Sequence, residues 1–300
     1  MNMQGVQKVH IWDYSRLNFV YTTLSKRKLQ WFVDQGHADS WDDPRFPTVQ
    51  GMKRRGLQID ALKEFILLQG ASRNANLMEW EKLWTLNKRI IDPVCPRHVA
   101  LIQSDRVELT LTNGPNEPEV ISVPKHKKYP PAGVKSTTRM SKIWLEQVDA
   151  ALLRDGDEVT LMDWGNCIIR AVSTNSLGSV VSVTGELHLE GSVKSTKLKL
   201  TWLPNSDELL PLILSDFDYL ITKKKAEEDD DFSDIVNHNS RIDSTALGDP
   251  NMRTLQKGDV LQLERKGYFI VDVPFQDIRT PITLFSIPDG RTKSWGVSCK

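Results

Sequence analysis

The chain has 300 residues, of which 39% are apolar and 26% are charged, and its 39 basic residues are balanced by 39 acidic ones. This length is enough to bury a substantial core and favours two domains, or three small ones. No apolar run approaches the ~20 residues of a membrane span, and residues 1–7 lack the features of a signal peptide. The sequence therefore predicts a cytosolic globular protein without a membrane partner.

The cysteine pattern argues against disulfide bonds and zinc sites. Cys95, Cys167 and Cys299 are far apart and odd in number, and none belongs to a C-x-x-C pair. This usage fits a reducing compartment, and no metal site is predicted.

Charged residues are unevenly distributed along the sequence, although the net charge is zero. Short basic clusters occur at residues 26–28, 53–55, 88–89 and 125–128, and acidic residues gather at 227–231 shortly after three lysines. A single basic cluster is most often a solvated surface, so these clusters alone do not predict nucleic-acid binding. The acidic run predicts an exposed loop that lies away from any phosphate backbone.

The first expected elements are a strand and two helices. Residues 9–12 are strand-like but have no partner before them. A helix is predicted over residues 60–69, with Asp60 as its N-cap and Gly70 just past its end. A second helix is predicted over residues 77–91, and its tryptophans are expected in the core.

Beyond Pro96 the apolar residues recur at every second position. Val107, Leu109 and Leu111 alternate with polar residues before the turn signal at residues 113–114. Similar short strands are predicted at residues 158–162, 167–172, 179–183, 198–202 and 259–263. This density of short strands favours two small β-barrels or sandwiches over a parallel α/β sheet.

Several separate segments resemble one family of enzymes, in the family's order. Residues 10–29 (HIWDYSRLNFVYTTLSKRKL) resemble the second ATP-site signature of class I aminoacyl-tRNA synthetases in its glutamyl/glutaminyl form, with T-L-S-K-R at residues 23–27 in place of K-M-S-K-S. Residues 41–48 and 54–56 resemble the lead into the family's tRNA-contacting helical domain. Residues 90–97 (IIDPVCPR), 246–253 and 262–269 are similar to eukaryotic-type cytosolic glutamyl-tRNA synthetases.

The resemblance implies an α+β, mainly β fold in three parts. Residues 1–30 correspond to the end of a class I catalytic domain and residues 31–95 to a helical stem-contact domain. Residues 96–300 correspond to an anticodon-binding domain of two β-barrels, the distal one at roughly residues 130–210. The family's H-I-G-H signature is absent from the sequence. The chain therefore looks like the C-terminal portion of a longer protein, and we expect it to be inactive alone.

The implied function is that of a glutamate-tRNA ligase. In this family ATP, with Mg²⁺, activates glutamate as an adenylate, and the glutamyl group is then transferred to tRNA-Glu. The resemblance gives Lys26 and Ser25 the catalytic contacts to the ATP phosphates, while Arg16, Leu17 and Leu24 border the nucleotide. Mobile cationic donors suit this chemistry, because negative charge develops as pyrophosphate leaves.

For anticodon recognition, the resemblance indicates Arg97 at the entry to the first barrel and Gln262 and Arg265 in its returning strand, where they read unstacked bases. A spacing of three puts two side chains on opposite faces of a regular strand, so Gln262 or Arg265 must lie past the strand end. An ion pair with an acid such as Glu264 explains any one of these residues equally well.

Two alternative functions stay open. Glutaminyl-tRNA synthetases share the motifs, but they carry second-barrel arginines that help to read the last anticodon base. The matching stretch here has Ala151, Leu152 and the sequence EVTLM at residues 158–162, which favours glutamate. The second alternative is a non-catalytic tRNA-binding fragment. Membership of a multi-synthetase complex is compatible with each of these functions.

Overall fold

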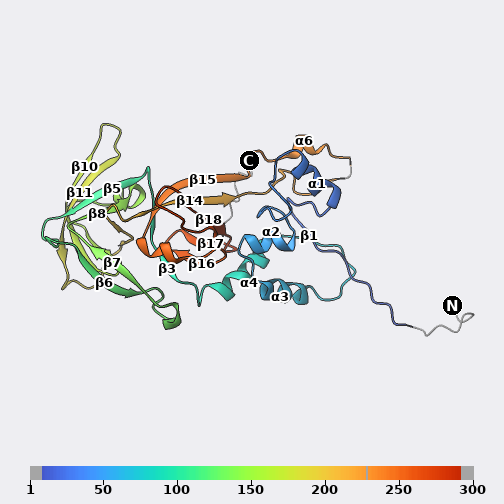
Figure 1. Ribbon diagram of the computed structural model, residues 1–300, viewed down its shortest axis with the longest axis horizontal. Helices are drawn as coiled ribbons and strands as arrows, with labels where there is room; N and C mark the ends of the chain where they lie inside the picture. Colours follow the sequence, from blue (N-terminus) through green and yellow to red (C-terminus); the bar gives the residue numbers. More distant parts are fainter. Residues whose placement is uncertain (1–8, 228, 292–300) are drawn as a thin grey trace, which may run out of the picture.

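The computed structural model describes residues 9–227 and 229–291 and is elongated (Figure 1). Two β-sheets occupy one half of the molecule, helices lie beside them, and the first described residues extend from the opposite end. No helix in these two ranges is long and apolar enough to cross a membrane.

The helices gather in the first third of the chain: α1 (Lys26–Asp34), α2 (Val49–Arg54), α3 (Ile59–Gln69) and α4 (Glu81–Ile91). The helix predicted over residues 60–69 is confirmed as α3, and Gly70, with a φ of 66°, ends it. The prediction that Asp60 is the N-cap is wrong, because α3 already begins at Ile59 and Gln58 precedes it.

The prediction of a strand at residues 9–12 is wrong. This stretch has no pairing strand among the described residues, and the side chains of Val9 and Ile11 are 70% and 75% exposed. The first strand is β1 (Asn18–Phe19), which pairs in parallel with β2 (Leu77–Met78). Because residues 77 and 78 belong to this pair, α4 begins at Glu81 and not at residue 77.

The tryptophans of the second predicted helix lie in the core, as expected. Trp80 and Trp84 are buried, and the Trp80 ring stacks on Phe19 with 4.0 Å between ring centroids. Phe217 and Ile270 of the second sheet belong to the same buried cluster. The helices and that sheet therefore share one core.

The first sheet has the strand order β12-β9-β10-β11-β5-β8-β13. The alternation predicted for Val107, Leu109 and Leu111 is confirmed, because all three are buried in one strand, whereas the strand predicted at residues 198–202 is only two residues long. The strands are β5 (Arg106–Leu111), β8 (Lys142–Glu146), β9 (Glu158–Leu161), β10 (Gly165–Thr174), β11 (Val180–His188), β12 (Lys199–Leu200) and β13 (Leu203–Pro204).

A two-stranded ribbon and a short helix accompany this sheet. The ribbon pairs β6 (Glu119–Pro124) with β7 (Val134–Arg139), and the 3₁₀ turn η1 (Pro130–Ala132) lies between them. Helix α5 (Gln147–Ala150) directly follows β8.

The second sheet has the order β3-β16-β17-β18-β14-β15-β4, so its strands come from both sides of the first sheet in sequence. Both sheets are curled and mostly antiparallel, which confirms the expected mainly β architecture. The strands are β3 (Arg97–His98), β4 (Ala100–Ile102), β14 (Leu210–Phe217), β15 (Arg241–Gly248), β16 (Val260–Leu263), β17 (Gly267–Val273) and β18 (Ile282–Ile287), and η2 (Pro250–Thr254) follows β15.

Between β14 and β15 the chain leaves the second sheet and packs against α1 (Figure 1). We call residues 218–240 the β14–β15 excursion; it contains α6 (Phe232–Ile235). Ile221 and Phe232 of the excursion share a buried cluster with Leu29 and Phe32 of α1. The described residues of the acidic run are largely exposed, as predicted, but they lie in this excursion and therefore near α1.

Candidate functional site

An open cavity of about 580 Å³ lies where residues 16–25 lead into α1. Three residues predicted to contact the nucleotide, Arg16, Leu24 and Ser25, line it together. Leu17 lines a neighbouring cavity of about 400 Å³ and packs against the core. Lys26 is the exposed first residue of α1 and follows Ser25 directly, but it does not line the cavity.

The residues at the start of α1 do not stabilise this helix by themselves. Ser25 is the N-cap, yet its hydroxyl makes no capping hydrogen bond, and the first turn holds Lys26, Arg27 and Lys28 without any acidic residue. A helix N-terminus has unpaired N–H groups and partial positive charge, so cations there destabilise it. A bound anion such as a phosphate reverses that effect. The local chemistry therefore fits the phosphates of a nucleotide.

One wall of the cavity comes from the β14–β15 excursion, which sequence reasoning did not connect with this site. Residues 225–227 line the same cavity. Lys28 donates from Nζ to the backbone oxygen of Glu227 at 3.0 Å, and Nζ lies 4.4 Å from the centre of the Phe232 ring. The acidic run thus borders the candidate phosphate loop, contrary to the expectation that it lies away from one. A contact across 199 positions leaves no local sequence signal.

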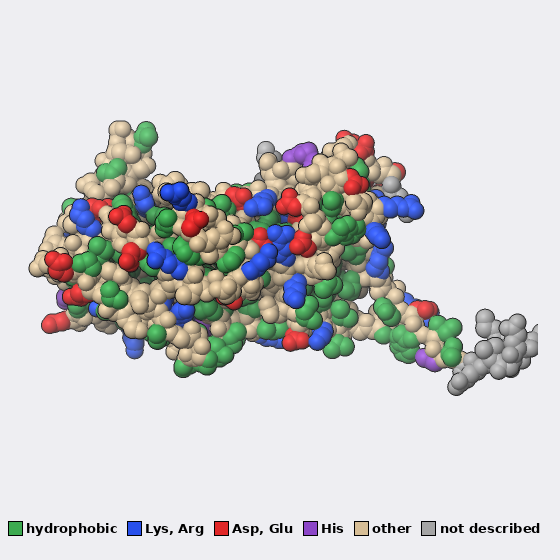
Figure 2. All heavy atoms as spheres, in the orientation of Figure 1, with side chains coloured by type: hydrophobic (Ala, Val, Ile, Leu, Met, Phe, Trp, Pro, Cys, Tyr) green, Lys and Arg blue, Asp and Glu red, His purple; other side chains and the backbone are tan. Residues whose placement is uncertain are grey.

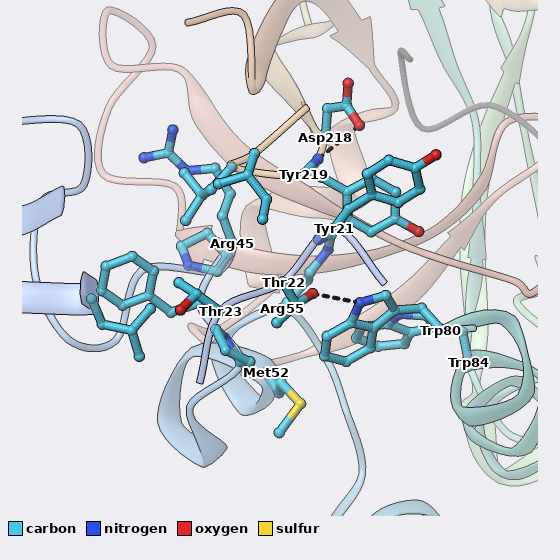
Figure 3. Close-up of a pocket in the computed structure, with 16 residues that line it drawn as sticks. Tyr21, Thr22, Thr23, Arg45, Met52, Arg55, Trp80, Trp84, Asp218 and Tyr219 are labelled. Atoms are coloured by element: carbon cyan, nitrogen blue, oxygen red, sulfur yellow. Dashed lines mark hydrogen bonds between the residues drawn. The ribbon is translucent and has the colours of Figure 1, made fainter. Parts of the chain in front are cut away.

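A second, smaller cavity adjoins the same loop (Figure 3). Its volume of about 30 Å³ has room for a water molecule and not for a nucleotide. Trp80 donates from Nε1 to the Thr22 hydroxyl at 3.0 Å, which fixes the loop against α4. Arg55 also lines this cavity; it donates to the backbone oxygen of Phe217 at 3.0 Å, and burial lowers its pKa to about 9. The first contact ties the loop to α4, and the second ties the end of α2 to β14.

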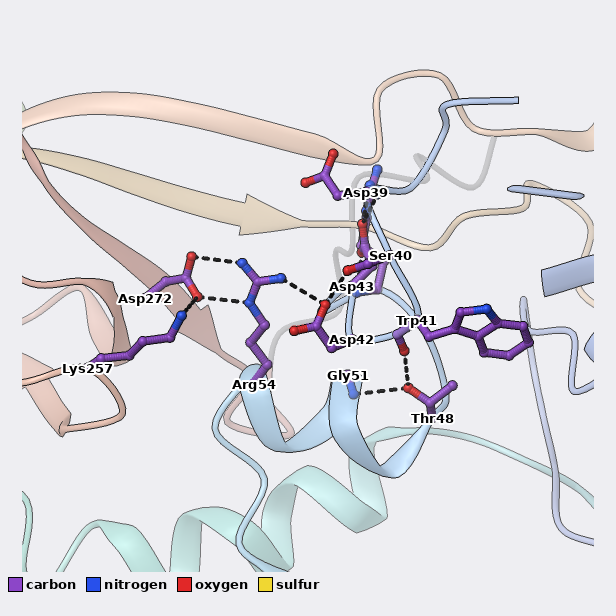
Figure 4. Close-up of polar contacts among 11 residues, drawn as sticks. Asp39, Ser40, Trp41, Asp42, Asp43, Thr48, Gly51, Arg54, Lys257 and Asp272 are labelled. Carbon is purple, nitrogen blue, oxygen red and sulfur yellow. Dashed lines mark hydrogen bonds and ion pairs between the residues drawn. The ribbon is translucent and has the colours of Figure 1, made fainter. Parts of the chain in front are cut away.

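Residues 41–48 form a polar support for α2 (Figure 4). The Thr48 hydroxyl accepts from the Gly51 N–H at 3.0 Å and donates to the Trp41 backbone oxygen at 2.8 Å. Asp43 accepts hydrogen bonds from the backbone and from the guanidinium of Arg45. The polar groups of residues 41–48, which resemble a family motif, therefore hold this segment against the start of α2.

Arg97 and Gln262 lie side by side on the second sheet. They are direct partners in the parallel register of β3 and β16. Arg97 Nε and Gln262 Oε1 are buried and have no hydrogen-bond partner within the described part of the chain. Such atoms are rare, because leaving a buried polar group unpaired costs about 1–3 kcal/mol. The edge of a nucleic-acid base offers the complementary donors and acceptors.

Arg265 lies apart from that pair. Strand β16 ends at Leu263, and Arg265 follows it in a turn with a φ of 66°, which confirms that one member of the Gln262 and Arg265 pair leaves the strand. Its guanidinium makes two hydrogen bonds to Asp149 in α5, one of 2.7 Å, and Asp149 is 2% exposed. Arg265 therefore pairs with an acid beside the first sheet, and not with Glu264, and it joins the two sheets.

Charged side chains surround Arg97. Lys135 in β7 donates to the Arg97 backbone oxygen at 3.0 Å, and Lys127 pairs with Asp163 at 2.8 Å. Burial raises the pKa of Glu264, although Lys135, Lys127 and Arg97 attract its carboxylate. Lys135 also attracts Asp249, so three carboxylates balance the three cations here and these groups carry no net charge.

In this chain, the residues that match the second-barrel arginine stretch of glutaminyl enzymes lie in two elements, at the end of α5 and in β9. Ala151 and Leu152 are exposed just after α5, and Val159 and Leu161 are buried in β9. These apolar side chains cannot form hydrogen bonds with a base edge.

Metal-binding and thiol chemistry receive no support from the described residues. No group of three or more His, Cys, Asp or Glu side chains among them is arranged to hold a metal ion. Cys95 and Cys167 are buried, and burial raises the pKa of each to about 11, which keeps both thiols protonated at neutral pH. Cys299 lies outside the described residues.

Three models of one family match the sequence in succession. Residues 1–93 match the catalytic domain of "tRNA synthetases class I (E and Q)". Residues 95–189 and residues 199–272 match two models that are each described as the anti-codon binding domain of these synthetases.

Similar proteins align with almost the whole chain. The Arabidopsis thaliana protein named "Glutamate--tRNA ligase, cytoplasmic" is 61% identical over 287 residues, which are 96% of this chain and 40% of that protein. The Schizosaccharomyces pombe protein named "Probable glutamate--tRNA ligase, cytoplasmic" is 47% identical, with the same coverage. The "Bifunctional glutamate/proline--tRNA ligase" of Cricetulus griseus is 41% identical over 98% of this chain and 20% of that protein. The chain thus spans 40% of the length of the first two relatives.

Proposed function

The chain belongs to the class I tRNA synthetases of the glutamyl and glutaminyl family, and from this membership we propose that it is part of a cytoplasmic glutamate-tRNA ligase. The observation that carries the proposal is the match, within one chain, to the family's catalytic domain and to two anti-codon binding domains. The names of relatives that are 45–61% identical favour glutamate over glutamine as the amino acid.

At the catalytic end, Ser25 and Lys26 hold the phosphates of ATP, which enters with Mg²⁺, and Arg16, Leu17 and Leu24 border the nucleotide. Glutamate attacks the α-phosphate to form an adenylate, and the terminal ribose hydroxyl of the tRNA then takes the glutamyl group. Positioned cations favour this reaction because negative charge develops on the leaving pyrophosphate. The acid-free, cation-rich first turn of α1 beside an open cavity of about 580 Å³ supports this assignment.

We assign three segments of the chain to the aminoacylation of tRNA. Residues 1–30 end the catalytic domain, residues 31–95 form the helical tRNA-contacting part, and residues 96–300 form the anticodon-binding barrels. The first sheet is the distal barrel; it extends beyond residues 130–210 because β5, at residues 106–111, belongs to it. The second sheet is the proximal barrel, and the core that it shares with the helices supports a fixed relation between the two.

The nucleic-acid partner is tRNA-Glu, whose anticodon bases contact Arg97 and Gln262. Their buried, unpartnered Nε and Oε1 atoms support this assignment. Arg265 remains a candidate, although its pairing with Asp149 favours a structural role. The bifunctional glutamate/proline ligases among the relatives favour a multi-synthetase setting for the whole protein.

Binding of the chain to tRNA-Glu, compared with the same tRNA carrying altered anticodon bases, tests the proposal. We expect tighter binding to the unaltered tRNA. Arg97→Ala and Gln262→Ala should each cost ~1–3 kcal/mol on the correct anticodon and less on altered ones, because base-edge contacts carry the discrimination. Arg170→Ala is the matched control, since this arginine is 51% exposed and pairs with Glu186 in the first sheet.

Two outcomes contradict the proposal. Equal affinity of the unchanged chain for every anticodon removes anticodon reading altogether. Equal losses on every tRNA after Arg97→Ala or Gln262→Ala make those residues contacts to the RNA backbone. Charging of tRNA by a protein of the relatives' full length, with glutamate and glutamine supplied separately, then decides the amino acid.

A further inference from the structure

A third cavity, of about 490 Å³, lies between α2, the start of α3 and the end of β17 (Figure 4). Its lining includes Lys53 and Arg54 of α2 and Lys257 of the turn before β16. Two carboxylates, Asp42 and Asp272, also line it. The cavity therefore has a mixed lining, in which three cations face two acids.

Arg54 offsets the charge of only one of the two acids, so these three side chains together carry one negative charge. Arg54 donates from Nε and Nη2 to the two oxygens of Asp272 at 2.8 and 3.0 Å, and from Nη1 to Asp42 at 3.3 Å. This guanidinium is held in place from both sides (Figure 4). The charge available to a ligand therefore resides on the lysines.

Both lysines are free to move toward an anion. Lys53 is exposed and has no ion pair within the described ranges. Lys257 is 66% exposed, and its Nζ lies 3.8 Å from an Asp272 oxygen that Arg54 already engages. This contact is longer than a hydrogen bond, and Asp272 keeps its two hydrogen bonds from Arg54 when Lys257 turns to another partner.

The cavity lies between the two sites already described. Along the long axis of the molecule, α2 stands between α1, which begins at the candidate ATP loop, and strands β3 and β16, which carry Arg97 and Gln262 (Figure 1). Lysine and arginine side chains gather near the middle of the molecule in this region (Figure 2). A ligand that reaches both sites at once spans the part of the long axis in which α2 lies.

We propose that Lys53 and Lys257 form a binding site for a backbone phosphate of the RNA, between the ATP loop and the anticodon-reading strands. This inference rests on the proposed function. Lysine binds phosphate as a point charge, and the amides of Gln50 and Gln58 add donors at the same cavity. None of the side chains that line it within the described ranges is aromatic, so the cavity suits a phosphate better than a stacked base.

The test measures the affinity of the chain for tRNA-Glu at several salt concentrations. Lys53→Ala and Lys257→Ala should each reduce the slope of log K against log salt by about 1, and each should weaken binding to correct and altered anticodons by the same factor. Lys63→Ala is the control, since this lysine is 69% exposed, pairs with Asp60 in α3 and lies outside the cavity. Thermal unfolding should be unchanged in all three variants.

Several results separate this inference from the proposed function. If the unchanged chain discriminates between anticodons but the double variant keeps the full salt slope and affinity, the phosphate site is wrong and the proposed function stands. Binding of inorganic phosphate that is lost in the double variant without any loss of tRNA affinity also overturns it, in favour of a free anion. If the unchanged chain does not bind tRNA, both fail.

Discussion

Arg54 in α2 binds both carboxylate oxygens of Asp272 in β17, with distances of 2.8 Å from Nε to Oδ1 and 3.0 Å from Nη2 to Oδ2. The two residues are 218 positions apart, so this pair ties the helical region to the second sheet. Asp272 is 8% exposed and Arg54 is 25% exposed. The hydrogen bonds that Arg54 donates to Asp272 raise the pKa of the guanidinium, which therefore stays charged.

Asp272→Asn should lower the free energy of unfolding by roughly 2–3 kcal/mol, because charge-assisted hydrogen bonds in a largely buried pair are lost. Urea denaturation measures this. Asp60→Asn is the control: Asp60 is 81% exposed and its pair with Lys63 should contribute less than ~1 kcal/mol. Equal effects of the two substitutions contradict the role given to the pair.

Lys26→Ala, made in a protein of the relatives' full length, should slow ATP-pyrophosphate exchange by ~10² or more, the usual effect of losing one charge-stabilising donor. Its tRNA affinity should change little. The substitution should not lower the temperature of unfolding, because a cation in the first turn of α1 does not stabilise that helix. With Lys63→Ala as the control, an unimpaired exchange rate removes Lys26 from the mechanism.

Local sequence patterns predicted the elements that depend on neighbours in the chain. The alternation in β5, Gly70 at the end of α3 and the buried Trp80 are of this kind. The spacing of Gln262 and Arg265 also predicted correctly that one of them leaves the strand, because the side chains of a strand alternate strictly.

Contacts between distant segments could not be predicted in this way. The pair of Arg265 with Asp149 spans 116 positions, and the contact of Lys28 with the β14–β15 excursion, which walls the ATP-loop cavity, spans 199. Residues 77–78 have helical spacing, but pairing with β1 overrides it. The sequence identified the residue types of the candidate sites, whereas tertiary packing decides which of them meet.

Asp249 should make the stability of the chain sensitive to acid. Burial alone raises its pKa, but the charge and hydrogen bond of His98, the charge of Lys135 and the Val99 N–H outweigh burial and hold the pKa well below the ordinary value of 3.8. A carboxyl with a lowered pKa stabilises the fold fully above its unfolded value. The free energy of unfolding should therefore fall as the pH drops below about 3.8 and toward the lower folded pKa.

Asp249→Asn tests that assignment. At pH 7 the variant should lose about 3–5 kcal/mol of stability, the usual effect of removing one partner of a buried ionic pair. Its stability should then depend less on pH below 4 than that of the unchanged chain. Asp243→Asn, at a pair whose acid is 45% exposed, is the control. If the free energy of unfolding depends on pH in the same way in the unchanged chain and in Asp249→Asn, other carboxyl groups cause the loss of stability in acid.

Glu264 should act in the opposite direction, because burial raises its pKa above the ordinary value of 4.5. The folded state then binds the proton more tightly than the unfolded state, so the ionised carboxylate destabilises the fold at neutral pH. This loss of stability is absent below pH 4.5. It develops between pH 4.5 and the higher folded pKa, and it is complete above that pKa. Glu264→Gln, which removes the charge and keeps the shape, should therefore raise the temperature of unfolding at pH 7 and have little effect at pH 4.

The same substitution separates stability from function at this surface. Arg97 and Gln262 leave buried polar atoms unpaired beside Glu264, and proteins retain such costs chiefly where a ligand uses the groups. Glu119→Gln is the control, because Glu119 is exposed at the start of β6. If Glu264→Gln stabilises the chain at pH 7 and Glu119→Gln does not, the carboxylate is kept at a cost to the fold. If Glu264→Gln destabilises the chain at pH 7, attraction by Arg97, Lys127 and Lys135 outweighs burial, and Glu264 is a structural partner of these cations.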